Sequence, residues 1–132
     1  MIFLDTDILS YYFSGNTIIR DKLLKVVQSG NKICLTCINV YEILKGLKYK
    51  NNTNKENLFR AFLKHSTVCG FDDNSISHAA NIYADLRSKG KIIGDADILI
   101  ASIVISNGGI LVSNNQKHYE DIPYLNLENW IE

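Results

Sequence analysis

The sequence predicts an α/β fold in which a parallel β-sheet is flanked by helices on both faces. Short apolar segments of strand length alternate with longer amphipathic segments of helical period along the whole chain. This alternation favours a parallel sheet whose strands are joined by right-handed crossovers. The length of 132 residues and the hydrophobic content of 46% fit a single domain, residues 1–132, with a substantial core.

The first part of the chain is predicted to form a strand and two helices. Residues 2–5 are apolar and predict a buried strand, which a short helix follows to about Phe13. After a turn, Asn16 caps a helix over residues 17–29, and Gly30 ends it. The inward face of this helix is predicted to consist of Ile19, Leu23, Val26 and Val27.

The middle of the chain is predicted to continue the alternation. A strand over residues 32–36 leads into a helix over 38–50, and a polar loop then caps a helix over 55–66. A third strand follows at 67–71. The apolar stripe of the helix at 38–50 is predicted to be Ile38, Tyr41, Leu44 and Leu47.

The last part begins with a helix after Asp73 that ends at residues 88–90. Its inward face is predicted to consist of Ile76, Ala79, Ala80, Tyr83 and Leu86. The remaining elements are a largely buried helix within residues 94–109, a strand at 110–113, a short helix within 114–122 and an edge strand at 124–127.

Charge and hydropathy argue against several classes of protein. Fourteen basic and fourteen acidic residues cancel, which argues against a pure nucleic-acid-binding module. The longest apolar run, residues 98–105, is far shorter than the roughly 20 residues that span a bilayer. The first residues turn acidic at once and carry no export signal. We therefore expect a cytoplasmic protein with no membrane segment.

The three cysteines predict neither a disulfide framework nor a metal site. Cys34 and Cys37 form a C-x-x-C motif, but no second ligand pair with zinc-site spacing accompanies it. Cys34 lies within a predicted strand, whereas a redox pair begins at a helix start. Buried, unreactive thiols are the expected state of these cysteines.

Acidic residues stand where predicted strands end or helices begin: Asp5, Asp7, Glu42, Asp95 and Asp97. Taken singly, each has a structural explanation, because Asp5 and Asp95 can cap helices and Glu42 can be an ordinary solvated side chain. Taken together, these positions can meet at one edge of a parallel sheet. Carboxylates packed there repel one another unless a cation neutralises them. Oxygen-only ligands favour Mg²⁺ or Mn²⁺, which supports phosphodiester or phosphoryl chemistry.

Five segments in register resemble a PIN domain, and more narrowly the VapC ribonuclease toxins of toxin-antitoxin pairs. They are FLDTDILS, INVYEILKG, IGDADILIA, ILVSNNQKHY and LNLENW, and the likeness covers nearly the whole chain. The resemblance implies a PIN-like parallel sheet and a metal-dependent ribonuclease that hydrolyses RNA without a covalent enzyme intermediate.

The resemblance also implies roles for individual residues. Asp5, Glu42 and Asp97 match the three acids that hold the metal, Mg²⁺ or Mn²⁺. Asp95 is interpreted as a capping residue that contacts the metal through water. Other residues are expected to support these ligands or the substrate: Thr6 and Ser113 as hydroxyls that steady the first acid, Asp7 as a group behind the metal ligands, Asn115 as a carbonyl ligand and His118 as a phosphate contact.

The chain departs from the family pattern at the fourth acid. Residues 113–118 read Ser-Asn-Asn-Gln-Lys-His and contain no carboxylate, so the sequence leaves open whether one or two metals bind.

Family members generally form homodimers and are silenced by a cognate antitoxin, so the resemblance implies a VapB-type antitoxin and a second copy as partners, besides RNA. Basic residues that flank the predicted site are candidates for phosphate contacts, although each fits a solvated helix face equally well: Lys45, Lys48, Lys50, Arg87, Lys89 and Lys91.

Two alternative functions stay open at this point. FLDTD, followed later by GDAD, also fits a haloacid-dehalogenase-like phosphatase, in which Asp5 would be phosphorylated. Leu9 departs from that pattern, and the chain is short for that fold. The missing fourth acid also leaves open a PIN-like fold that binds a partner without catalysis.

Overall fold

The computed structural model describes residues 1–131 and confirms the predicted parallel sheet. All neighbouring strands pair in parallel, in the order β3-β2-β1-β4-β5. Because β1 lies between β2 and β4, the carboxyl ends of these three strands meet at one edge, where open α/β sheets bind their ligands. The strands are β1 (Ile2–Leu4), β2 (Ile33–Thr36), β3 (Thr67–Cys69), β4 (Ile110–Val112) and β5 (Asn126–Glu128).

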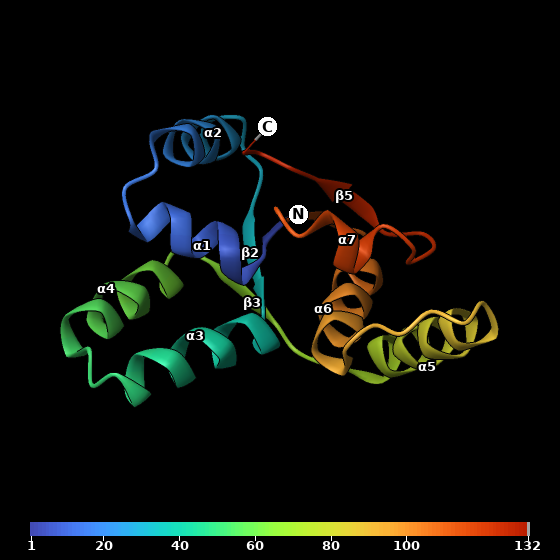
Figure 1. Ribbon diagram of the computed structural model, residues 1–132. Coiled ribbons are helices and arrows are strands. Elements are labelled where there is room, and N and C mark those ends of the chain that lie inside the picture. Colours follow the sequence, from blue (N-terminus) through green and yellow to red (C-terminus); the bar gives the residue numbers. More distant parts are fainter. Residues whose placement is uncertain (132) are drawn as a thin grey trace.

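Helices cover both faces of this sheet, with α1 to α4 on one side and α5 and α6 on the other (Figure 1). They are α1 (Thr6–Phe13), α2 (Thr17–Gln28), α3 (Cys37–Tyr49), α4 (Thr53–Leu63), α5 (Asp73–Ser88), α6 (Asp95–Ser106) and α7 (Gln116–Tyr119). Within residues 1–131, none of them combines the length and the apolar content that a membrane crossing requires.

The sheet separates two apolar cores because successive strand residues point to opposite faces. Phe3 packs with α5 and α6, whereas Ile2 and Leu4 pack with α1, α2 and α4. β1 is therefore buried on both sides, and its three residues are at most 7% exposed. This double burial explains the apolar run that ends at Asp5.

Side-chain caps fix where several helices begin. Asn16 Oδ1 accepts a hydrogen bond from the Ile19 backbone N–H at 3.1 Å, as the sequence predicts. Thr36 Oγ1 accepts one from the Asn39 backbone N–H at 3.1 Å, which starts α3 at the end of β2. Since a cap fixes the first turn, it also fixes which residues of the helix face the sheet.

The inward faces of three helices differ from the prediction. Tyr41 of α3 is 61% exposed, and Val27, Ile76 and Tyr83 are each about half exposed. Ala80 is exposed as well. Apolar residues on neighbouring stripes of a helix compete for the core, and hydrophobicity alone does not decide between them. The buried residues of α5 are Ser75, Ala79, Ile82 and Leu86.

The last strand begins later than predicted. β5 spans Asn126–Glu128, whereas the prediction was 124–127. Tyr124 has a φ of 66° and is 92% exposed. A left-handed backbone cannot continue a strand, so Tyr124 belongs to a turn.

The three cysteines are free, but only Cys34 is fully buried. The prediction of burial is wrong for Cys37, which opens α3, and for Cys69, which lies on the edge strand β3. Burial nevertheless raises the pKa of the Cys34 and Cys69 thiols, which disfavours the reactive thiolate.

Candidate active site

Asp5 stands at the centre of the predicted edge, directly after β1, and is 4% exposed. Its Oδ1 accepts hydrogen bonds from the Thr6 backbone N–H at 2.9 Å and from Asn39 Nδ2 at 3.0 Å. Its Oδ2 accepts one from Ser113 Oγ at 2.8 Å. Three separate segments of the chain therefore fix the orientation of this carboxylate.

A chain of hydrogen bonds connects Asp5 to Glu42. Besides binding Asp5, Asn39 Nδ2 donates to Thr6 Oγ1 at 2.9 Å, and Thr6 Oγ1 donates to Glu42 Oε1 at 2.9 Å. Asn39 is fully buried, and its own Oδ1 accepts from Thr36 Oγ1 at 2.6 Å. The amide is thus held at both ends, which positions the two acids relative to each other without any direct contact between them.

Asp97 enters the site from the first turn of α6. Its Oδ1 accepts from the Tyr119 hydroxyl at 3.2 Å, and its Oδ2 lies 3.0 Å from Nδ1 of His118, which is 55% exposed. Burial raises the pKa of Asp97 above its ordinary value, and Asp5 adds to the rise, while His118 and Tyr119 act in the opposite direction. The neighbours of Asp97 therefore do not fully compensate the negative charge of its ionised form.

The Tyr119 hydroxyl lies against both aspartates, and the residue is 1% exposed. Burial, together with the charges of Asp5 and Asp97, raises the pKa of its phenol far above the ordinary range. The hydroxyl stays protonated and has one proton to offer to two carboxylates. Excess negative charge remains at this point, which a bound cation would balance.

The donor set fits a hard divalent cation, since the converging groups are carboxylate oxygens. In the present side-chain arrangement, however, residues 1–131 contain no ready-made group of three or more His, Cys, Asp or Glu side chains that could hold a metal ion. Asp5 and Asp97 face the same phenol, whereas Glu42 is held one step away by Thr6. The assignment of Asp5, Glu42 and Asp97 as a shared metal site stays a prediction.

The loop after β4 forms the other wall of the site. Asp7 Oδ2 accepts from the Asn114 backbone N–H at 2.9 Å, and Asp7 Oδ1 accepts from the Ile8 N–H at 2.7 Å. Burial, followed by the charge of Asp5, raises the pKa of Asp7. Asp7 therefore ties this loop to α1, and the loop in turn places Ser113 against Asp5.

Two predicted roles change in detail. The Thr6 hydroxyl steadies Glu42 and not Asp5, which the Thr6 backbone N–H holds instead. Asp95 is not the cap of α6, because Gly94 occupies that position in extended conformation and Asp95 is the first helical residue, exposed to solvent. Its contact with a metal through water stays a prediction.

The predicted roles of Asn115 and His118 also remain untested. Asn115 donates its backbone N–H to Ser113 Oγ at 3.0 Å, while its exposed side chain stays available. His118 reaches the site through Asp97, and its exposed ring leaves room for a phosphate contact.

Sequence reasoning missed Asn39 and Tyr119. A signal existed for Asn39, since it is the polar residue of an otherwise apolar first turn and lies three positions before Glu42, on the same helical face. For Tyr119 no local signal exists, because its partners come from distant segments.

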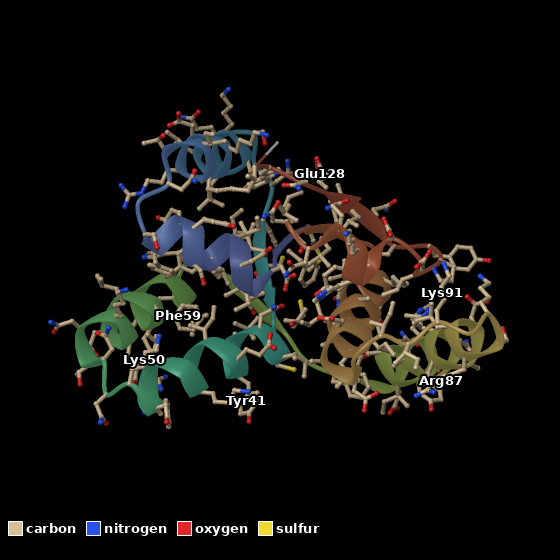
Figure 2. All side chains as sticks on the ribbon, viewed as in Figure 1. Tyr41, Lys50, Phe59, Arg87, Lys91 and Glu128 are labelled. Carbon is tan, nitrogen blue, oxygen red and sulfur yellow. The ribbon has the colours of Figure 1, made fainter. Side chains whose placement is uncertain are left out.

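Most of the candidate phosphate-binding residues are engaged elsewhere. Lys48 pairs with Glu56, Lys89 with Asp85 and Lys91 with Asp121. Lys45 lies over the ring of Tyr41 and Arg87 over the ring of Tyr83. In the part of the chain that is described, Lys50 has no such partner and reaches into the space between α3 and α4, near Phe59 (Figure 2).

Comparisons with known proteins agree with the fold. The PIN domain family model matches residues 2–122, which include all the candidate site residues. Ribonuclease VapC2 of Haemophilus influenzae is 34% identical over 130 residues, covering 97% of this chain and 96% of the relative. The tRNA(fMet)-specific endonuclease VapC of Salmonella typhimurium is 29% identical over 102 residues, 76% of each protein.

Among solved structures, VapBC2 from Rickettsia felis, bound to a DNA fragment from their promoter, matches with a TM-score of 0.89 at 30% identity. The match covers 98% of this chain and 99% of that chain. The chain therefore belongs to the PIN-domain family and, within it, to the VapC ribonucleases.

Proposed function

We propose that this chain is the ribonuclease toxin of a VapBC-type pair and that it hydrolyses RNA phosphodiester bonds with the help of Mg²⁺ or Mn²⁺. The observation that carries the proposal is the buried Asp5, which meets Asp97 across the Tyr119 phenol and is tied to Glu42 through Asn39 and Thr6. The relatives named as ribonucleases support the reaction class.

Asp5, Glu42 and Asp97 would hold the metal, with Asp95 assisting through water. When bound, the ion supplies a polarised phosphate oxygen and a water of lowered pKa. Asn39, Thr6 and Ser113 keep the acids oriented through the hydrogen bonds described above, and Asp7 secures the loop that bears Ser113. Glu42 would exchange its Thr6 hydrogen bond for the ion.

His118 and Asn115 would act on the substrate side of the site. The His118 ring is oriented by Asp97 and exposed, so that it can donate a hydrogen bond to a phosphate oxygen. Asn115, at the start of α7, can offer its side-chain carbonyl where the family pattern has a fourth acid. The absence of that acid supports a single firmly held ion.

A VapB-type antitoxin is the proposed protein partner. The solved structures that this chain matches are VapBC complexes, from Rickettsia felis and from Salmonella typhimurium, in which toxin and antitoxin are bound to DNA. A homodimer and a cytoplasmic site of action, where the chain would meet RNA, are part of the same proposal.

The test compares single isosteric changes in the acids. Asp5→Asn and Asp97→Asn keep the shape of the side chain but remove its charge, so each should abolish RNA cleavage in Mn²⁺ buffer. In the unchanged protein, EDTA should stop the same cleavage. Asp21→Asn, on the exposed face of α2, serves as the matched control and should cleave normally. Circular dichroism checks folding.

Full cleavage by both site variants would refute the proposal. A folded protein that neither cleaves RNA nor binds Mn²⁺ would instead be a PIN-fold binding module. The phosphatase alternative is not retained, because the family match assigns the FLDTD segment to a PIN domain.

A further inference from the structure

A groove of about 280 Å³ runs between α1, α3 and α4 and begins at the candidate active site. Thr6 and Glu42 line its near end, and Lys50 and Lys55 line it further along. Its floor is apolar and includes Phe59, which lies close to Lys50 between α3 and α4 (Figure 2). The groove thus combines an acidic end, an apolar floor and a basic end.

Gly46 lies in the middle of α3 and also lines this groove. A glycine inside a helix is unfavourable, and this one has neither a left-handed backbone nor a close neighbour that would require it. A Cβ built at Gly46 meets nothing within 4 Å. Packing of the chain itself does not explain this residue, whereas a ligand that needs the open space would.

The two lysines of the groove, Lys50 at the end of α3 and Lys55 in α4, differ from the lysines within α3. Lys45 and Lys48 are occupied by Tyr41 and Glu56, respectively. Among the described residues, Lys50 and Lys55 take part in no ion pair, and Glu42 is the one acid that lines the groove. The positive charge at the far end is therefore free to bind an anionic ligand.

We propose that this groove holds the stretch of RNA next to the bond that is cut, with Lys50 and Lys55 contacting its phosphates. The proposal rests on the proposed ribonuclease function. From Glu42 to Lys50, α3 advances about 12 Å, the length of about three to four stacked nucleotides at roughly 3.4 Å each. The phosphates of such a strand would meet the bound cation at the acidic end of the groove and the free lysines at its basic end. The apolar floor between them suits the bases.

The first experiment measures binding without cleavage. A short fluorescein-labelled single-stranded RNA of mixed sequence, and total tRNA as competitor, are titrated with the full chain in EDTA between about 50 and 200 mM salt. Lys50→Gln/Lys55→Gln should lower the slope of log affinity against log salt by about 1.4, since each lost phosphate contact removes about 0.7. Lys45→Gln/Lys48→Gln, with the same charge change within α3, should leave the slope unchanged.

The second experiment fills the groove. Gly46→Leu improves the helical tendency of α3, and its Cβ meets no atom within 4 Å. The rest of the side chain has the open groove to enter, so the protein should fold at least as well as before. Its side chain should nevertheless weaken RNA binding about tenfold by excluding a stacked base. Gly46→Ala controls for the change in helical tendency, and it should weaken binding much less.

Equal slopes for the two lysine pairs, normal RNA binding by Gly46→Leu, or no RNA binding by the unchanged chain would each overturn the proposal. If Gly46→Leu keeps its RNA affinity but no longer co-purifies with the antitoxin encoded beside this chain, the groove belongs to that protein instead. Because binding is read in EDTA, these outcomes are distinct from a failure of the cleavage test with Asp5→Asn.

Discussion

At the scale of single residues, the acid at the end of β1 is surrounded by neutral donors and not by cations. Asn39, Ser113 and the Thr6 backbone bind Asp5, and none of the ion pairs within residues 1–131 involves it. A lysine in the place of Asn39 would cancel the charge that a metal needs. Neutral donors fix the orientation of the carboxylate and leave its charge available.

Asn39→Ala tests this role. The change removes the amide that links Asp5 to Thr6 and leaves the buried Thr36 hydroxyl without its acceptor. The free energy of unfolding should fall by about 1–3 kcal/mol, the cost of leaving buried polar groups unsatisfied, as urea denaturation would measure. RNA cleavage should fall with it, because Asp5 and Glu42 lose their connection.

Asn74→Ala on the exposed surface of α5 is the matched control and should change the free energy of unfolding by less than about 0.5 kcal/mol. An equal loss in both variants would mean that the buried network at Asn39 contributes nothing specific.

At the scale of elements, α3 divides its surface between the core and the site. Asn39, Glu42, Gly46 and Lys50 are spaced by three, four and four residues, so they form one stripe that borders first the site and then the groove. The sequence predicted that α3 exists from its period, but it placed Tyr41 in the core because the residue is apolar. The Thr36 cap and the polar stripe set the phase of the helix, which turns Tyr41 outward.

The turn before β5 supplies a prediction about backbone strain. Tyr124 adopts a φ of 66°, which is costly for a residue with a Cβ, and its exposed side chain buries little surface in return. Tyr124→Gly should raise the free energy of unfolding by about 1 kcal/mol, because glycine adopts this conformation freely. Thermal unfolding would show the effect as a higher midpoint.

Tyr124→Ala is the suitable comparison for Tyr124→Gly. Tyr83→Gly is not, because position 83 is helical. Alanine keeps the strain and removes the ring, so Tyr124→Ala should gain nothing. If alanine stabilises the protein as much as glycine does, the backbone at Tyr124 is not strained.

At the scale of the whole molecule, the candidate site follows from strand order. The parallel sheet that the sequence predicted brings the carboxyl ends of β1, β2 and β4 to one edge. Hydrogen bonds there join Asp5 to Glu42 through Asn39 and Thr6. That these two acids and Asp97 share a metal ion stays a prediction. The sequence could not predict that Asn39 binds an acid 34 positions away or that Tyr119 binds one 22 positions away. These contacts depend on β1 lying between β2 and β4, an order that local patterns do not encode.

The grouping of acids at this edge predicts that Asp97, a proposed metal ligand, lowers the stability of the protein when no metal is bound. The size of this effect depends on pH. Burial raises the pKa of Asp97 above its ordinary value of 3.8, so the folded protein holds this proton more tightly than the unfolded chain does. The stabilisation that comes from this tighter proton binding is fully present below the pKa of Asp97 in the unfolded chain. It is lost as the pH rises through the pKa in the folded protein. At pH 7 without metal, the ionised carboxylate therefore opposes folding.

Asp97→Asn removes that charge and can keep its contact with the Tyr119 hydroxyl. In EDTA at neutral pH the variant should be more stable than the unchanged protein, and the difference should vanish as the pH falls below the ordinary value of 3.8. Mn²⁺ should reverse the order, because it stabilises the folded state that binds it and Asp97→Asn has lost a ligand. Thermal unfolding across pH, with and without Mn²⁺, measures both effects. Equal stabilisation of the two proteins by Mn²⁺ would place the ion away from Asp97 and refute the proposed metal site.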